Sequence, residues 1–308
     1  MTTGILFPGQ GAQFEGMGQD WAEAFPEARE TFEAADATLG FSLSEACWSS
    51  GDEVNRTDIA QPAIFTTSVA ILRALKGQGI EFQDAALTAG LSLGEYTALW
   101  FAGVLSFEDG VRLVRLRGEA MQAASEACPS GMVSLMGATP ESAAALAEVG
   151  SAHGICQVAN LNSPAQIVVS GEFAALDAVD AAAKDHGVRR TRRLTVAGGF
   201  HSECMRPAAD TLAAALESVT LGEPQIPVIS NVTAEPVTGP DQVRELLALQ
   251  VCAPVLWERS MRAALGGGTT DFVEPGPGTT LGGIMKKIDE QASLRSVARP
   301  ADLDAFRG

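Results

Sequence analysis

A serine lies between two glycines at residues 90–94, where the sequence reads GLSLG. The frame Gly-x-Ser-x-Gly is typical of a nucleophile elbow, a sharp turn between a strand and a helix that presents a serine hydroxyl to a substrate carbonyl. The frame alone is weak evidence, because glycines flank a serine by chance about once in a hundred positions in so glycine-rich a chain. The context strengthens it, since the strand-like run 84–90 precedes Ser92 and helix-forming residues begin at Gly94. Ser92 is therefore a candidate nucleophile, and a plain tight turn is the alternative.

A serine nucleophile needs a base, usually a histidine, and the sequence offers three. His186 ends a predicted helix, where an imidazolium would stabilise the last carbonyls, and His153 lies in a predicted surface loop. His201 follows a predicted strand and two glycines that allow close approach of another backbone. Elimination favours His201 as the base. Cys204 is a rival nucleophile in principle, but a buried thiol is the simpler interpretation.

An arginine interrupts the apolar face of the helix predicted over 110–122. The residues three and four positions from Arg117 are all apolar: Leu113, Val114, Ala120 and Met121. Arg112, Arg115 and Glu119 share a different face, which the pattern indicates is solvated. Burying an unpaired guanidinium is costly, so Arg117 needs an anionic partner. That partner is either an internal Asp or Glu or a substrate carboxylate, which the planar fork of arginine suits.

Two glycine-rich segments resemble phosphate loops without completing the pattern. FPGQGAQ (7–13) has Phe14 where a dinucleotide-binding loop has its third glycine. A glycine turn at this position could instead offer a backbone N–H to an oxyanion. EPGPGTTLGG (274–283) lacks the Gly-Lys-Ser/Thr ending of an ATP-binding loop, and a structural turn after the strand DFVE is the better interpretation.

The charge balance bounds the class of partner. The chain has 21 Lys and Arg against 38 Asp and Glu, a formal net charge of −17. This argues against a nucleic-acid partner, because phosphate binding needs concentrated positive charge. An anionic ligand would need a local cluster such as RRTRR (189–193) or Lys286-Lys287, although solvated surface charge is the simpler interpretation of each.

The cysteines and the apolar runs indicate the compartment. Five scattered cysteines without a Cys-x-x-Cys pair favour free thiols in a reducing cytoplasm over a disulfide framework or a zinc site. The first residues show neither a basic leader nor a cleavage pattern, and no apolar run approaches the roughly 20 residues that span a bilayer. We therefore expect a cytoplasmic protein with no metal and no membrane contact.

The elements that must position these residues alternate between strands and helices, as in an α/β domain. The pattern predicts strands over 2–9 and 84–90 and helices over 61–77 and 94–106. Pro62 suits the first turn of the helix over 61–77 and Gly77 its end.

A separate unit is predicted between residues 128 and 196. Its segments follow the order β-α-β-β-α-β of a ferredoxin-like fold. The strands are predicted over 131–138, 155–161, 165–171 and 188–196, and the helices over 140–150 and 173–187. We interpret 128–196 as a small subdomain inserted into a large α/β domain formed by 1–127 and 197–308.

The motifs, taken together, resemble the malonyl-CoA:acyl-carrier-protein transacylase family, whose members load malonyl units for fatty acid synthesis, and the similar acyltransferases of polyketide synthases. The resemblance runs through most of the chain in family order. It is carried by FPGQGAQ, TDIAQPAIFTTSVA (57–70), GLSLGEYTAL (90–99), RLRGEAMQ (115–122), ANLNSPAQIVVSG (159–171), GGFHS (198–202), SNVTAEPV (230–237), QVCAPVLWERSM (250–261) and FVEPGPG (272–278).

The resemblance implies an α/β-hydrolase-like large domain with a parallel-sheet core beside the ferredoxin-like subdomain. It implies that Ser92 accepts the acyl group, that His201 is its base, and that Arg117 binds the malonyl carboxylate. It implies that Gln10 and Leu93 supply oxyanion-hole backbone N–H groups, and that the Gln250 backbone carbonyl orients His201.

Further positions follow from the same resemblance. Asn160 and Asn162 would line the cleft side of the small subdomain. Phe200 matches malonyl-selective relatives, and its bulk leaves less room for an α-methyl group. Two positions depart from the family: Leu91 stands where a histidine is common, and Thr279 where a basic residue is common.

The implied activity is transfer of malonyl from malonyl-CoA to the phosphopantetheine thiol of acyl carrier protein through a malonyl-serine, with ping-pong kinetics and no cofactor. A monomer is implied. The alternatives are a serine esterase or thioesterase, a transferase serving a polyketide synthase, and a silent carrier-binding module.

Because carrier proteins are acidic, we expect a basic patch on this chain to bind them. In a strand, Arg189 and Arg193 share one face and Arg190 and Arg192 the other, so at most half could serve.

Overall fold

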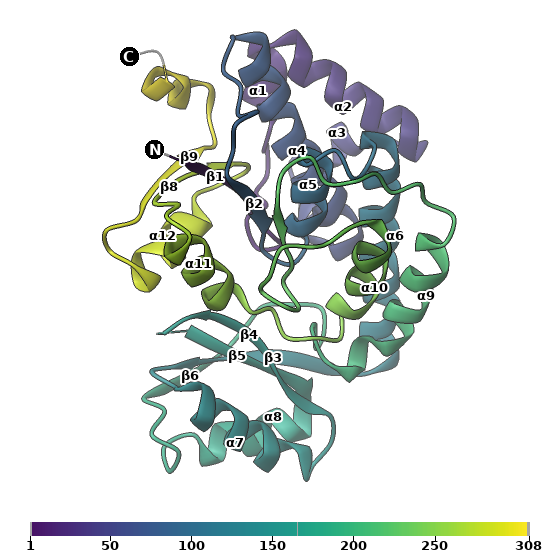
Figure 1. Cartoon of the computed structure of the whole chain (residues 1–308). Helices are drawn as coiled ribbons and strands as arrows, with labels where there is room; N and C mark the ends of the chain where they lie inside the picture. The colour runs from purple at the N-terminus through teal and green to yellow at the C-terminus, as the bar shows by residue number, and fades with distance from the viewer. Residues whose placement is uncertain (1, 165, 307–308) are drawn as a thin grey trace.

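The computed structural model describes residues 2–164 and 166–306, which form two sheets (Figure 1). The first sheet has the strand order β7-β2-β1-β8-β9, and its neighbouring strands all run parallel. Its strands are β1 (Thr3–Phe7), β2 (Leu87–Gly90), β7 (Val228–Ile229), β8 (Asp271–Pro275) and β9 (Ser293–Val297). This is the parallel core of an α/β-hydrolase-like domain, as the sequence predicts.

Helices cover both faces of the parallel sheet (Figure 1). They are α1 (Gln19–Ala24), α2 (Pro26–Leu39), α3 (Leu43–Trp48), α4 (Thr57–Gly77), α5 (Gly94–Phe101), α6 (Phe107–Ala127), α9 (Arg206–Leu216), α10 (Pro240–Gln250), α11 (Trp257–Gly266) and α12 (Thr280–Ile288), with 3-10 turns η1 (Glu53–Asn55), η2 (Glu203–Met205) and η3 (Pro300–Phe306). Ile5 and Phe7 of β1 pack in the core that contains α4, α5 and α6, whereas Leu6 packs with α11 and α12. Successive side chains of a strand point to opposite faces, so this central strand is buried on both.

Helix α4 begins earlier than predicted. It starts at Thr57, so Pro62 lies inside the helix and not in its first turn, and that prediction was wrong. A proline has no N–H to donate to the carbonyl four residues before it, here that of Asp58. Nη1 of Arg115, from α6, donates to the Asp58 carbonyl at 2.8 Å. A side chain from another helix therefore replaces the missing hydrogen bond, and Arg115 is half-buried against α4 where the pattern had indicated a solvated position.

Helices α4 and α6 pack closely where Arg117 lies. A Cβ at Gly118 would lie 2.6 Å from the Thr57 carbonyl oxygen, so only glycine permits this approach. Arg117, the preceding residue, is 1% exposed. The sequence prediction that its side chain is buried is confirmed.

The helix predicted over 94–106 is shorter in the structure. It ends at Phe101, and Gly103 follows in the left-handed region at φ +78°. A left-handed glycine after the last turn is a common helix stop.

The second sheet is antiparallel, in the order β4-β5-β3-β6. Its elements are β3 (Ser130–Met136), α7 (Pro140–Ser151), β4 (Cys156–Ser163), β5 (Gln166–Glu172), α8 (Phe173–Ala182) and β6 (Arg190–Arg193). The predicted β-α-β-β-α-β order is confirmed, although β6 is shorter than the strand predicted over 188–196 and Ala165 lies outside the described residues. The subdomain limits at 128 and 196 stay a prediction.

One face of this sheet is closed by its own helices and the other faces the large domain. Val133 and Leu135 of β3 pack with α7 and α8. Met132 and Val168 pack on the opposite face with residues of α6 and α9. The edge strand β4 is also joined to the large domain, because Val255 donates to the Ala159 carbonyl at 2.9 Å and Leu161 donates to the Val255 carbonyl at 2.9 Å. The subdomain thus lies against the segment that follows α10 (Figure 1).

No helix among residues 2–164 and 166–306 is both long enough and apolar enough to cross a membrane.

Candidate active site

Ser92 lies on a sharp turn between β2, which ends at Gly90, and α5, which begins at Gly94. Its φ is +52°, in the left-handed region that a serine seldom adopts. A Cβ at Gly90 would collide with the backbone of Gly94, and a Cβ at Gly94 with the Phe7 carbonyl. Both glycines of the frame are therefore required sterically, and the strand-turn-helix context predicted for Ser92 is present.

A residue that sequence reasoning missed holds this turn. Asn231 accepts a hydrogen bond from the Ser92 N–H at 2.6 Å and donates from Nδ2 to the Gly90 carbonyl at 2.7 Å. These two bonds fix the strained peptide units on both sides of Leu91. The only sequence signal was its position in the block SNVTAEPV, which by itself reads as a turn.

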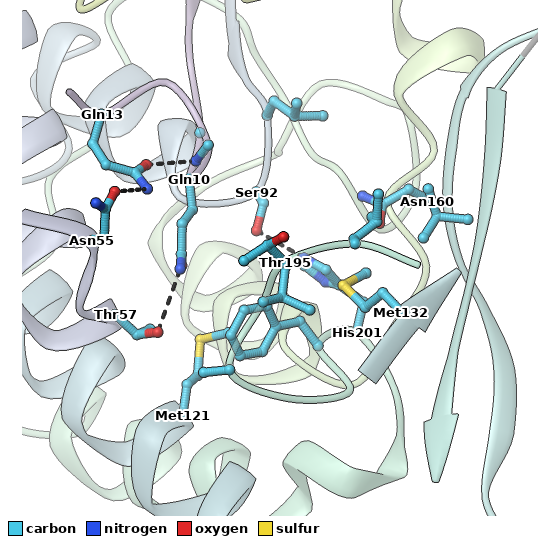
Figure 2. Close-up of a pocket in the computed structure, with 18 of the residues that line it drawn as sticks. Gln10, Gln13, Asn55, Thr57, Ser92, Met121, Met132, Asn160, Thr195 and His201 are labelled. Carbon is cyan, nitrogen blue, oxygen red and sulfur yellow. Dashed lines mark hydrogen bonds between the residues drawn. The ribbon is translucent and has the colours of Figure 1, made fainter. Parts of the chain in front are cut away.

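His201 meets Ser92 across 109 residues of chain (Figure 2). Its Nε2 lies 2.8 Å from Ser92 Oγ, and its Nδ1 lies 2.8 Å from the backbone carbonyl oxygen of Gln250. Because a carbonyl only accepts, Nδ1 carries the proton and donates it, which leaves Nε2 free to accept from the serine hydroxyl. The geometry is that of a nucleophile paired with a base whose orientation is set by a backbone carbonyl.

The environment keeps His201 neutral. Burial and, as the second cause, the nearby positive charge of Arg117 lower the pKa of His201 to about 4. His201 also has φ +60°, so both members of the pair occupy the left-handed region. Gly198 precedes it closely, and a Cβ there would collide with Ser125, which explains why the chain turns on glycine before the histidine.

Arg117 approaches the nucleophile from α6. Its Nη2 donates to Ser92 Oγ at 3.1 Å and to Gln250 Oε1 at 3.0 Å, and its Nη1 donates to Gln61 Oε1 at 2.8 Å. Within the described ranges its Nε finds no acceptor. No carboxylate forms an ion pair with it in the part of the chain that the structure describes, so the internal salt bridge is not observed. Gln61 is a second residue that sequence reasoning missed.

A cavity of about 820 Å³ opens above Ser92, between the large domain and the second sheet (Figure 2). Predicted site residues that line it are Gln10, Ser92, Arg117, Asn160, Asn162, Phe200 and His201, together with Leu91. Met121 and Met132 add apolar surface on either side of the serine (Figure 2). Such a cleft suits an acyl group carrying a long arm.

Two of the predicted site residues, Leu93 and Gln250, lie behind the residues that line the cavity. Leu93 is fully buried, and Gln250 is 1% exposed beneath Arg117. The backbone N–H groups of Leu93 and Gln10 donate to no acceptor in residues 2–164 and 166–306. Leu93 N–H lies at the start of α5, where a helix favours negative charge, so this end of the cavity can stabilise an oxyanion.

The glycine-rich loop after β8 is structural, as predicted. Glu274 is completely buried there and accepts hydrogen bonds from the N–H groups of Leu281 at 2.9 Å and Gly282 at 3.3 Å. Ser296 Oγ donates to the same carboxyl at 2.7 Å. A carboxylate therefore already occupies the start of α12, where a phosphate loop would hold its ligand.

The other candidates lie outside the cavity. Cys204 is buried and His153 is exposed in the small subdomain; neither Cys204, His153 nor His186 lines the cavity. Among the described residues, no group of three or more His, Cys, Asp and Glu side chains could hold a metal ion. The arrangement of Ser92, His201 and Arg117 at the cavity is suited to nucleophilic acyl chemistry.

Known proteins resemble this chain over almost its full length. The model of a family described as acyl transferase domain matches residues 5–299. The malonyl CoA-acyl carrier protein transacylase of Bacillus subtilis is 40% identical over 302 residues, covering 97% of this chain and 94% of that protein. The crystal structure of an acyl carrier protein S-malonyltransferase from Vibrio cholerae superposes with a TM-score of 0.95 at 35% identity, covering 99% and 100% of the two chains. A malonyl-transacylase in complex with a type II polyketide synthase acyl carrier protein superposes with a TM-score of 0.94 at 36% identity, covering 99% and 98%.

Proposed function

The chain belongs to the acyl transferase family, and from this premise we propose that it transfers malonyl from malonyl-CoA to the phosphopantetheine thiol of acyl carrier protein in fatty acid biosynthesis. The relatives named above are similar over nearly their whole length, which supports this substrate pair. The reaction is an acyl transfer between two thiols, and it needs no cofactor because malonyl-CoA is itself a substrate.

Ser92 and His201 carry out both halves of the reaction. His201 Nε2 takes the proton of Ser92 Oγ as Oγ bonds to the thioester carbon, and the tetrahedral oxyanion is held by the N–H groups of Leu93 and Gln10. The C–S bond then breaks, the proton passes from His201 to the CoA sulfur, and malonyl-serine remains. The carrier thiol gives its proton to His201, attacks the same carbonyl and displaces Ser92, which recovers its proton. One serine serves both thiols in turn, so the kinetics are ping-pong.

Arg117 is the observation that favours malonyl among acyl groups. Its guanidinium is buried 3.1 Å from Ser92 Oγ, and its hydrogen-bond partners are all neutral. A malonyl group attached to Ser92 carries a carboxylate two carbons beyond the carbonyl, within reach of the guanidinium. The malonyl carboxylate would supply the anionic partner that no described side chain provides, through charge-assisted hydrogen bonds.

The remaining cavity residues shape the substrate. Phe200, Met121 and Met132 form an apolar wall that leaves little room for an α-methyl group. Asn162 is 8% exposed, and its Oδ1 accepts no hydrogen bond from the described residues, so it can accept from an amide N–H of the pantetheine arm. Asn160 lines the same side of the cleft.

The carrier protein docks beside the cavity on β6. Arg193 is not available to bind the carrier, because its guanidinium forms ion pairs with two carboxylates of α8, Asp177 at 2.6 Å and Asp180 at 2.8 Å. Arg190 and Arg192 alternate onto the other face of the sheet, where Arg192 lies across β3 from Val168 and Arg190 from Gln166. Val168 and Gln166 line the cavity.

The side chains of Arg190 and Arg192 are exposed and form no ion pair or hydrogen bond within the described ranges. Positive charge at the rim of an otherwise acidic enzyme steers an acidic carrier toward the entrance.

The protein acts as a monomer in the cytoplasm. Its five cysteines are free thiols, four of them buried, which suits a reducing compartment.

Intact-protein mass spectrometry after brief mixing with malonyl-CoA, without an acceptor, tests the proposal. We expect a malonyl adduct on the wild type that is absent from Ser92→Ala. Free malonate accumulating without an adduct would establish a thioesterase instead. Neither adduct nor turnover would indicate a silent carrier-binding module. Transfer to a polyketide carrier but not to a fatty acid carrier would identify the alternative pathway.

A further inference from the structure

Gln250 contacts Ser92, His201 and Arg117, and the partners of its side-chain amide define one orientation. Its backbone carbonyl accepts from His201 Nδ1 at 2.8 Å. Its side-chain Oε1 accepts from Arg117 Nη2 at 3.0 Å, while Nε2 donates to the Ser92 carbonyl at 2.9 Å and to Glu95 Oε2 at 2.5 Å. The residue is 1% exposed, so no water replaces these contacts.

The amide orientation matters because its two ends have opposite hydrogen-bonding character. An amide has nearly the same shape when its oxygen and nitrogen exchange places. After such an exchange, Nε2 would face the Arg117 donor, and Oε1 would face the Ser92 carbonyl and Glu95. Both contacts would then be repulsive. The acceptors on the far side of Gln250 therefore keep its Oε1 turned toward Arg117, and this contact holds the guanidinium at Ser92 together with the bond from Arg117 Nη1 to Gln61.

Glu95 is the carboxyl acceptor on that far side. It lies in the first turn of α5, is 2% exposed and does not line the cavity. Its Oε2 also accepts from the Asn231 N–H at 3.3 Å, and the Ser230 side chain lies within hydrogen-bonding reach. The charged or titratable groups nearest to it are Arg117 and Tyr96. The Glu95 carboxyl group and the Arg117 guanidinium are thus joined through one amide.

We propose that Glu95 is a positioning residue for acyl selectivity: through the Gln250 amide it holds the Arg117 guanidinium beside Ser92 in the orientation that receives a malonyl carboxylate. This inference rests on the proposed function. It assigns to Glu95 the control of the substrate class and leaves the attack by Ser92 to the pair with His201. An acetyl group has no carboxylate, so its transfer depends on Arg117 only through the contacts of the guanidinium with Ser92 and His201, and much less on its exact orientation.

Two substitutions separate the hydrogen bond from the charge. Glu95→Gln keeps an oxygen where Oε2 lies, so it still accepts from Gln250 and Asn231. Glu95→Ala removes that acceptor. We expect kcat/KM for malonyl-CoA to fall 10- to 100-fold in Glu95→Ala and less than about fivefold in Glu95→Gln, with acetyl-CoA changing less than about threefold in both.

Thermal melting and labelling of Ser92 by a fluorophosphonate provide readouts that do not involve a substrate carboxylate. A Glu95→Ala protein that melts cooperatively and labels at the wild-type rate has an intact pair with His201. If its malonyl and acetyl rates fall by the same factor, the inference is overturned. The same holds if Glu95→Gln loses selectivity as fully as Glu95→Ala. It also holds if Glu95→Ala is too unfolded to label, because Glu95 would then serve the fold and not the selectivity. A wild type that forms no malonyl adduct would instead refute the proposed function.

Discussion

Replacing Arg117 with alanine should separate malonyl transfer from acyl transfer in general. The substitution removes the buried cation that lies 3.1 Å from Ser92 Oγ, without touching His201 or the backbone of the elbow. A hydrogen bond to a charged group contributes roughly 1.5–3 kcal/mol, and losing the contact with the malonyl carboxylate should raise the barrier by about 3 kcal/mol. At 1.36 kcal/mol per tenfold change, this is a decrease of roughly 100-fold in kcat/KM for malonyl-CoA.

Acetyl transfer should behave differently in the same variant. Acetyl carries no carboxylate, so it loses no charge-assisted contact with the acyl group when the guanidinium is removed. The positive charge of Arg117 also lowers the pKa of His201, so its removal makes the imidazole a stronger base. We therefore expect acetyl transfer from acetyl-CoA to stay level or rise.

The assay follows the first half-reaction by intact mass after rapid quenching, with malonyl-CoA and acetyl-CoA in parallel. Arg115→Ala is the matched control, because Arg115 lies on the same helix, carries the same charge and contacts Asp58 and Glu119 outside the cavity. The clamp is refuted if malonyl and acetyl rates fall by one common factor in Arg117→Ala. It is also refuted if Arg115→Ala shifts the ratio as strongly.

Three further outcomes are expected. The acid limb of the pH profile of kcat/KM for malonyl-CoA should lie well below pH 6.5, because His201 has a pKa of about 4 and stays neutral down to that pH. A limb at pH 6.5, or a limb that Arg117→Ala does not move, would contradict the lowered pKa. Burial raises the pKa of Glu95 to about 7 from 4.5, so the folded state binds more protons than the unfolded state and the free energy of unfolding falls as pH rises from about 4.5 to 7. In urea titrations Glu95→Gln should therefore gain up to about 3 kcal/mol of stability over wild type between pH 5 and 8. An equal pH dependence of the two proteins would contradict the raised pKa. Replacing Arg190 and Arg192 with glutamate should raise KM for the carrier protein about tenfold and leave malonyl loading of Ser92 unchanged. Arg193→Glu should alter stability alone. An unchanged KM would refute the proposed docking surface.

Local patterns predicted the parts of the site that depend on short stretches of chain. The elbow at Ser92 follows from two glycines between a strand and a helix, and the burial of Arg117 follows from helical spacing. The residues that were missed act over long separations. Asn231 meets Ser92 across 139 residues, and Gln61 meets Arg117 across 56, so nothing in their own segments indicates the contact.

The start of α4 was mispredicted for a related reason. Pro62 favours a helix start locally, because a proline inside a helix leaves a carbonyl unpaired. The Arg115 side chain from α6 pairs that carbonyl, so a tertiary contact overrides the local preference. Glu95 was likewise invisible as a partner of Gln250, since their 155-residue separation is closed only by the fold.

The bonds between β4 and Val255 connect carrier recognition with the tuning of the base. Val255 exchanges hydrogen bonds with Ala159 and Leu161 on the edge of the subdomain, and it lies five residues beyond Gln250, whose carbonyl orients His201. The small subdomain also presents Arg190 and Arg192. A displacement of that subdomain would therefore be transmitted along a short, hydrogen-bonded segment to the imidazole. If the carrier docks at Arg190 and Arg192 as proposed, a poorly seated carrier would disturb the base as well as the delivery of its thiol.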